Sequence, residues 1–203
     1  MPKVLPDGIE LSLQPLTGAE EEARSIAAAV SDRHHTLLIG KEATETAFKA
    51  LAETHNIIHL ATHGIAYTDD PLQSFVALSS GKTETGEIEN GLLTAREVAQ
   101  NRSLPADLIV LSACQTGLGR ISGDGMLGLS RAFLIAGART VLVSQWSVSD
   151  SATKELMFTF YKNYLNSGNK ATALQEAMQK VRSHPAYNCP RYWAAFVVVG
   201  AEV

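Results

Sequence analysis

The fold of this chain is decided by the stretch Asp107-Leu108-Ile109-Val110-Leu111-Ser112-Ala113-Cys114-Gln115-Thr116-Gly117. Its apolar run, Leu108 to Leu111, is short and is bounded by polar residues. Such a run is typical of a buried strand in a parallel sheet, because helices cover both faces of that sheet. Open α/β sheets place their ligands and chemistry at the carboxyl ends of the strands. Cys114 is therefore predicted to lie at the carboxyl end of a central strand.

A second stretch has the same design and runs Asn56-Ile57-Ile58-His59-Leu60-Ala61-Thr62-His63-Gly64. Ile57 to Ala61 is predicted to be another buried strand. If the two strands are parallel neighbours, His63 and Cys114 meet at one edge of the sheet. A cysteine beside a histidine is the minimal thiol nucleophile with its base, since imidazole can stabilise the thiolate and later protonate a leaving amine. Gly64 lets the backbone approach a substrate closely.

These residues also have simpler explanations. A lone cysteine is more often a buried structural residue, and a lone histidine after a strand is more often a turn residue. His59 lies on the same strand face as His63, and we interpret it as a core histidine. Cys189 is interpreted as a bystander. A metal site made of His59, His63 and Cys114 is disfavoured, because such ligands usually come in close pairs. No metal and no cofactor is expected.

Further motifs follow one another along the chain. They are Ala61-Thr62-His63-Gly64, Leu111 to Gly117, Gly123-Asp124-Gly125, Ala136-Gly137-Ala138 and Ser144-Gln145-Trp146-Ser147-Val148-Ser149-Asp150. Over nearly the whole chain, this order resembles the CHAT domain, the caspase-like domain usually found behind tetratricopeptide repeats. The resemblance implies an α/β fold, a caspase-like three-layer sandwich with a mainly parallel six-stranded sheet and helices on both faces. It implies a single domain over residues 1–203, with a poorly defined segment at residues 1–16.

The resemblance also implies an activity. It indicates a cysteine endopeptidase, a hydrolase of peptide bonds, with His63 and Cys114 as the catalytic dyad and an acyl-thioester intermediate. The backbone amides of Gly64 and Cys114 would form the oxyanion hole. Protein substrates are implied, together with an activating repeat domain or regulatory protein.

A catalytically silent regulatory or scaffolding module that binds a protein partner is the alternative. The intact dyad favours the enzyme. The glycine-rich segment from Leu118 to Gly125 favours regulation, because order–disorder switches are found in such loops. A protease that stays latent until a partner activates it is therefore expected.

Three residues are candidates for the substrate pocket: Ser144, Trp146 and Asp150. Their stretch is similar to that of separases, in which an aspartate faces an arginine of the substrate. A carboxylate at the base of a pocket would favour a basic residue before the scissile bond, because leaving it unpaired is costly. Equally open is that Asp150 caps a helix beginning near Ser151. Asp124 is either a helix cap or an activation-loop residue.

Composition narrows the class of protein. The chain has 203 residues, 45% of them hydrophobic and 19% charged, as expected for one soluble α/β domain. Its net charge of −4, without a dense Lys/Arg cluster, argues against direct nucleic-acid binding. No apolar run approaches the ~18 residues of a membrane span, and no signal peptide is recognised. Only two cysteines occur, which suits a reducing, cytoplasmic location.

Other elements are predicted from periodicity and caps. Helices are expected over Thr17–Val30 with Thr17 as cap, Ala43–Ala52, Thr94–Gln100 with a Thr94/Glu97 capping box, Met126–Ala136, Ser151–Leu165 and Ala171–Arg182. Strands are expected through Ile9, Leu11 and Leu13, and over Thr36–Ile39, Phe75–Leu78, Val141–Val143 and Trp193–Val199, with a hairpin that returns at Glu87-Ile88. The last strand is the predicted sheet edge, and its apolar character suggests a homodimer or a covering domain.

Overall fold

The core of the protein is a six-stranded sheet in a computed structural model that describes residues 3–4, 10–67, 69–83, 85–101, 103–115 and 123–201. The strand order is β10-β9-β8-β3-β4-β7. The strands are β3 (Ile57–Ile65), β4 (Phe75–Ala77), β7 (Leu92–Thr94), β8 (Leu108–Gln115), β9 (Thr140–Ser144) and β10 (Phe196–Gly200). Strands β3, β8 and β9 are parallel, whereas β4 and β10 run antiparallel to their neighbours. The predicted mainly parallel sheet is confirmed.

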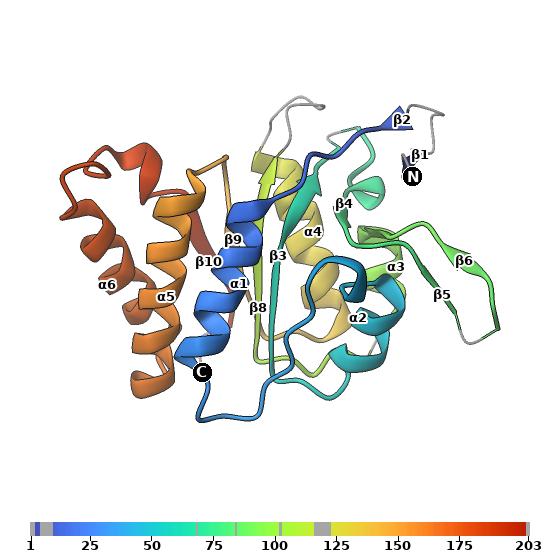
Figure 1. Cartoon of the computed structure of the whole chain (residues 1–203), viewed down its shortest axis with the longest axis horizontal. Coiled ribbons are helices and arrows are strands. Elements are labelled where there is room, and N and C mark those ends of the chain that lie inside the picture. The colour runs from blue at the N-terminus through green and yellow to red at the C-terminus, as the bar shows by residue number, and fades with distance from the viewer. Residues whose placement is uncertain are drawn as a thin grey trace.

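Helices cover both faces of this sheet (Figure 1). One core joins the sheet to α1 (Thr17–Ala29), α5 (Asp150–Ser167) and α6 (Lys170–Arg182). The other core joins it to α2 (Glu45–Ala52), α3 (Ala95–Gln100) and α4 (Gly123–Ala136). The predicted caspase-like sandwich of three layers is thus confirmed.

Alternation along β8 explains why this strand is central. Ile109 and Leu111 pack into the α2–α3–α4 core, and Leu108 and Val110 pack into the α1–α5–α6 core. All four side chains are completely buried. Burying apolar area on both faces is the largest favourable term available to a strand, so this run fixes the middle of the sheet.

Both parallel strands extend further than the apolar runs indicate. β3 continues to Ile65 because β4 pairs with it at Gly64 and Ile65, and β8 continues to Gln115 against β3. His63 and Cys114 therefore lie within their strands, close to the carboxyl end of each. We call the edge where β3, β8 and β9 end the carboxyl edge.

The helix predictions hold with small changes at the ends. Thr94 and Glu97 form the predicted capping box of α3. Gly137 ends α4 with a φ of 117°, a conformation that favours glycine. Thr17 is the first residue of α1 and not its cap, because Leu16 takes the cap position without a side-chain hydrogen bond.

Three strand predictions were wrong in whole or in part. Residues 36–39 are not a strand, because no neighbouring strand pairs with them. The last strand begins at Phe196, since the preceding Pro190–Tyr192 forms a short 3-10 helix. The amino-terminal strand is reduced to β2 (Glu10–Leu11), which pairs with β1 (Lys3–Val4) in a separate small sheet.

The predicted hairpin is present and is formed by β5 (Gly81–Lys82) and β6 (Ile88–Glu89). It projects from the body of the molecule (Figure 1). Among the helices in the described ranges, none combines the length and apolarity that crossing a bilayer requires.

Candidate active site

The two candidate catalytic residues are register partners. β3 and β8 pair in parallel with His63 opposite Cys114 and Gly64 opposite Gln115. β9 lies on the other side of β8, with Leu111 opposite Val143, so Ser144 also lies at the carboxyl edge. The prediction that the two strands are parallel neighbours is confirmed, and it brings His63 and Cys114 to the same level of the sheet.

The imidazole of His63 is oriented by a backbone carbonyl. Its Nε2 atom lies 2.7 Å from the carbonyl oxygen of Gln14. A carbonyl oxygen only accepts, so this hydrogen bond assigns the proton of a neutral imidazole to Nε2 and leaves Nδ1 as an acceptor. His63 is 6% exposed, and its Nδ1 has no hydrogen-bond partner in the described part of the chain. The atom free to take a proton is therefore Nδ1.

Sequence reasoning missed this contact. Gln14 lies just before α1, and it takes part through its backbone. A backbone carbonyl has the same chemistry at every residue, so no residue type in the sequence marks this position. Only the placement of the α1 entry beside β3 reveals it.

A second histidine on β3 belongs to a buried network. The Nε2 atom of His59 lies 3.0 Å from the Glu22 carboxylate of α1, and its Nδ1 lies 3.1 Å from the Tyr161 hydroxyl of α5. The carboxylate accepts from Nε2–H, so the hydroxyl donates to Nδ1. Burial raises the pKa of Tyr161 well above its usual value, and the charge of Glu22 adds to this, so the phenol stays a donor. His59 is an interior residue, as interpreted from the sequence, and it ties α1 and α5 to β3.

The backbone around Gly64 is paired on both sides. Gly64 is opposite Val76 of β4 and opposite Gln115 of β8. An oxyanion-hole amide must point at the reacting oxygen and not at a neighbouring strand. The predicted oxyanion role of Gly64 and Cys114 remains a prediction, and the side chain of Cys114 lies outside the described part of the structure.

The three predicted pocket residues lie at the end of β9 and in the segment that follows it. Ser144 ends the strand and is buried. Trp146 is 36% exposed, and its indole Nε1–H donates to the carbonyl of Arg191 at 3.1 Å. Asp150 is the first residue of α5 and is exposed. Because β9 ends beside β8, all three residues lie toward the carboxyl edge, the edge at which His63 lies.

Asp150 does not cap α5. Ser149 takes the cap position, and no side-chain capping hydrogen bond forms there. Instead Asp150 packs against Gly18 in the first turn of α1, where a Cβ would collide with its side chain. The carboxylate thus lies at the amino-terminal ends of two helices, which favour negative charge. Among the described residues it forms no salt bridge.

The glycine-rich segment is only partly described. Gly123, Asp124 and Gly125 form the first turn of α4, and the prediction for residues 118–122 lies outside the described residues. Cys189 is free and exposed. Within the described ranges, no group of three histidine, cysteine or acidic residues could hold a metal ion.

Comparison with known proteins identifies relatives. A family model described as "CHAT domain" matches residues 6–201. Human tetratricopeptide repeat protein 28 is 31% identical over 217 aligned residues, which cover 93% of this chain and 9% of that protein. The mouse protein of the same name is 42% identical over 112 residues, covering 55% of this chain and 4% of that protein. The chain therefore spans less than a tenth of the length of these curated relatives.

Proposed function

This chain belongs to the CHAT domain family, and we propose that it is a cysteine endopeptidase with His63 and Cys114 as its catalytic dyad. The observation that carries the proposal is the state of His63. Its Nε2–H is held by the Gln14 carbonyl, and its buried Nδ1 is unpartnered within the described residues, opposite Cys114 in the strand register. A base fixed by one nitrogen and free at the other is suited to activate a nucleophile.

Position 114 alternates with Leu108 and Val110, which pack on the face of the α1 and α5 helices. Position 114 is therefore on the same face of the sheet as position 63, its register partner. Nδ1 takes the thiol proton, and the thiolate forms a C–S bond to the scissile carbonyl carbon while the carbonyl electrons move to oxygen. Collapse of this intermediate breaks the C–N bond, and the imidazolium gives its proton to the departing amine.

The acyl-thioester is then hydrolysed by water. His63 Nδ1 takes a proton from the attacking water, a second tetrahedral intermediate forms, and its collapse breaks the C–S bond. The thiolate leaves and recovers the proton from the imidazolium, so the dyad returns to its starting state. The hydrogen bond from His63 Nε2–H to the Gln14 carbonyl keeps the ring oriented while Nδ1 accepts and releases the proton.

We propose that the isolated domain is latent. The imidazole is 6% exposed, so a peptide cannot reach it in the arrangement that the structure describes. The named relatives are tetratricopeptide repeat proteins, which supports a repeat domain, or a regulatory protein, as the activating partner. A cytoplasmic location is proposed with this role.

Asp150 is the proposed source of a preference for a basic residue before the scissile bond, with Trp146 and Ser144 beside it. Its exposed carboxylate forms no salt bridge with the described residues, so it is available to an incoming cation. Packing against Gly18 fixes the direction of its side chain.

The second candidate function is a silent regulatory module. Its support is that Gly64 has a strand partner on both sides, Val76 of β4 and Gln115 of β8. Such a module would bind a protein partner, and β10 at the edge of the sheet is the surface through which a homodimer would form.

Labelling with a peptidyl ketone tests the proposal. The probe carries arginine before an electrophilic ketone, and mass mapping identifies the modified residue. Modification at Cys114 that is lost in His63→Ala and Cys114→Ala supports both the dyad and the basic pocket. If Cys114 is labelled only by a probe that carries an apolar residue in place of the arginine, the proposed role of Asp150 is wrong. If neither probe labels Cys114 while a small alkylating agent still reaches it, a latent protease or a purely regulatory module is favoured, and the same labelling in the presence of the activating partner separates these two.

A further inference from the structure

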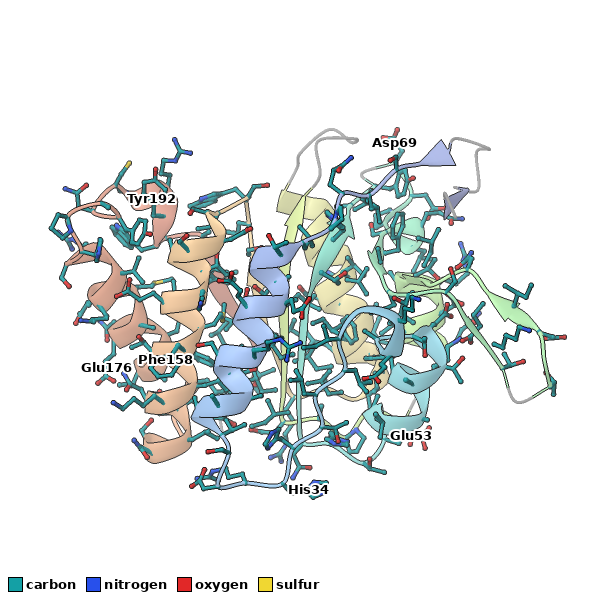
Figure 2. All side chains as sticks on the ribbon, in the orientation of Figure 1. His34, Glu53, Asp69, Phe158, Glu176 and Tyr192 are labelled. Carbon is teal, nitrogen blue, oxygen red and sulfur yellow. The ribbon has the colours of Figure 1, made fainter. Side chains whose placement is uncertain are left out.

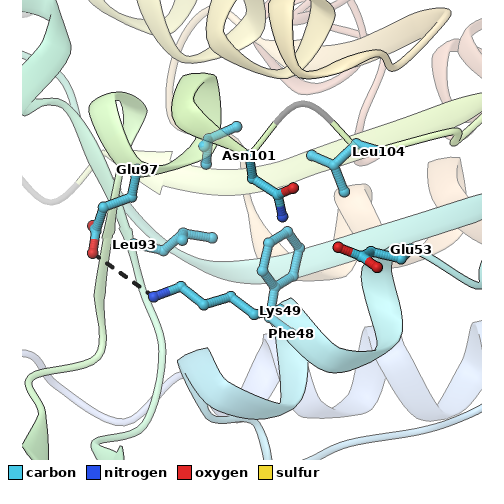
Figure 3. Close-up of a pocket in the computed structure, with 8 residues that line it drawn as sticks. Phe48, Lys49, Glu53, Leu93, Glu97, Asn101 and Leu104 are labelled. Atoms are coloured by element: carbon cyan, nitrogen blue, oxygen red, sulfur yellow. Dashed lines mark ion pairs between the residues drawn. The ribbon is translucent and has the colours of Figure 1, made fainter. Parts of the chain in front are cut away.

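A cavity of about 310 Å³ lies between α2 and α3 (Figure 3). Its floor is apolar and consists of Phe48, Leu93, Val98 and Leu104, all of them buried. Ring contact with Phe133, at 6.4 Å between centroids and 80° between planes, holds Phe48 in place. The ring of Phe48 points toward Asn101 (Figure 3). The floor is therefore a fixed apolar surface that can receive a short aliphatic stem.

The rim of this cavity is acidic. Lys49 pairs with Glu45 at 2.7 Å, with Glu89 at 3.1 Å and more loosely with Glu97 at 3.9 Å. One ammonium thus serves three carboxylates. Burial raises the pKa of Glu45, and the charge of Glu97 adds to this despite the bond from Lys49. The cluster has more negative charge than its single cation neutralises.

Glu53 adds a further carboxylate on the other side of the cavity (Figure 3). It occupies the carboxyl-terminal cap of α2, where the helix dipole is negative and a carboxylate is disfavoured. No salt bridge to Glu53 occurs among the described residues. A cation placed between Glu53 and Glu97 would offset the unfavourable negative charge at the end of α2 and the excess negative charge of the Lys49 cluster.

We propose that this cavity is a docking site for a basic side chain, arginine in first place, presented by a partner polypeptide. The aliphatic stem would lie on the apolar floor, and the guanidinium would lie on the Phe48 ring and between the two rim carboxylates. Arginine fits better than lysine because its planar fork can donate two parallel hydrogen bonds to one rim carboxylate.

A polypeptide fits this place better than a free small molecule. The cavity is at the small end of the range for ligand pockets, so it receives one side chain. Beside it, Glu89 connects the Lys49 cluster to the projecting β5–β6 hairpin.

This site is separate from the carboxyl edge. None of the residues that line it belongs to the group around His63. Glu53 lies at the opposite end of the molecule from Asp69, which follows β3 (Figure 2). Binding here therefore does not depend on the proposed protease chemistry.

The test is residue-resolved NMR titration of the whole chain, labelled with ¹⁵N. The probe is acetyl-Gly-Ser-Arg-Leu-Ser-Gly-amide, and its matched peptides carry citrulline or glutamate in place of arginine. The arginine peptide is expected to shift the amides of Lys49, Glu53 and Asn101. Citrulline, the neutral isostere, should bind at least about threefold more weakly, and the glutamate peptide should not bind. Shifts confined to α5 would place the peptide at Asp150 and overturn the proposal.

Variants sharpen the test. Glu53→Gln and Glu97→Gln should each lower the affinity for the arginine peptide by about two- to fivefold, the range expected for the loss of an exposed ion pair. Glutamine at 97 retains the capping box of α3, so this variant keeps its helix start. Glu155→Gln on α5 is the matched control and should change nothing. Equal affinity for arginine and citrulline would overturn the charge recognition, and acetyl-arginine-amide binding as tightly as the hexapeptide would overturn the polypeptide partner.

Discussion

The Nε2 atom of His63 and the carbonyl oxygen of Gln14 are 2.7 Å apart, and this contact joins the segment that enters α1 to the end of β3. It determines which nitrogen of the ring is free. Because α1 is itself tied to β3 through Glu22 and His59, the position of one helix governs the orientation of the proposed base.

The first prediction concerns the tautomer of His63. Neutral His63 should be protonated at Nε2 and unprotonated at Nδ1, because the Gln14 carbonyl accepts only a donor. Imidazole ¹⁵N chemical shifts of the Cys114→Ala variant measure this without interference from a thiolate. A dominant Nδ1–H form would contradict the assignment.

The second prediction concerns the buried network of α1. Glu22→Ala should lower the free energy of unfolding by about 1–3 kcal/mol, because it leaves the buried His59 Nε2–H without an acceptor. Urea denaturation measures the change. The neighbouring Glu21→Ala is the control, since Glu21 is 65% exposed and its pair with Lys154 should contribute no more than about 1 kcal/mol. Equal losses in the two variants would contradict the role of the network.

The third prediction concerns pH. Partial burial alone would raise the pKa of Asp107, but the hydrogen bonds from Lys170 and Tyr164 outweigh it and hold that pKa below its usual value. A carboxyl with a lowered pKa in the folded state stabilises the fold above its unfolded pKa, and the stabilisation is lost as pH falls through the folded pKa. Unfolding free energies between pH 7 and pH 3 should therefore fall more steeply in the wild type than in Asp107→Asn. Parallel curves would contradict this.

The fourth prediction concerns the contact between α1 and α5. Gly18→Ala should destabilise the protein by about 1–3 kcal/mol, because the new Cβ collides with the Asp150 side chain, its Cβ included. Asp150→Gly removes the obstacle. A double-mutant cycle by urea denaturation should show the double variant to be more stable than the sum of the single losses predicts. Additive losses would show that the two residues do not meet.

The strands that place the dyad could be predicted because their signal is local. The run Leu108 to Leu111 is buried on both faces, and so it identifies a central strand. The prediction of a strand over residues 36–39 was wrong because a strand needs a neighbouring strand to pair with. A composition typical of strands does not provide that neighbour. The extension of β3 beyond its apolar run, as at Gly64, depends on pairing with β4. It therefore cannot be predicted from the sequence of β3 alone.

The candidate site could be predicted only in its reactive side chains. His63 and Cys114 are residue types with known chemistry, and the strand register brings them together. Gln14 takes part through its backbone, and Asp150 is fixed by packing against Gly18, so neither contact has a sequence signature. Ser149 takes the cap position because α5 begins at Asp150, one residue earlier than the predicted start near Ser151.

Alkylation of the two cysteines tests the central claim most directly. The chain is treated with iodoacetamide between pH 5 and pH 9, and mass mapping gives separate rates for Cys114 and for the exposed Cys189, which serves as the internal reference. A thiolate paired with His63 should make Cys114 react faster than Cys189 at pH 6, by about tenfold or more, and His63→Ala should abolish the difference. A Cys114 that reacts no faster than Cys189 at pH 6, with or without His63, would contradict a catalytic dyad.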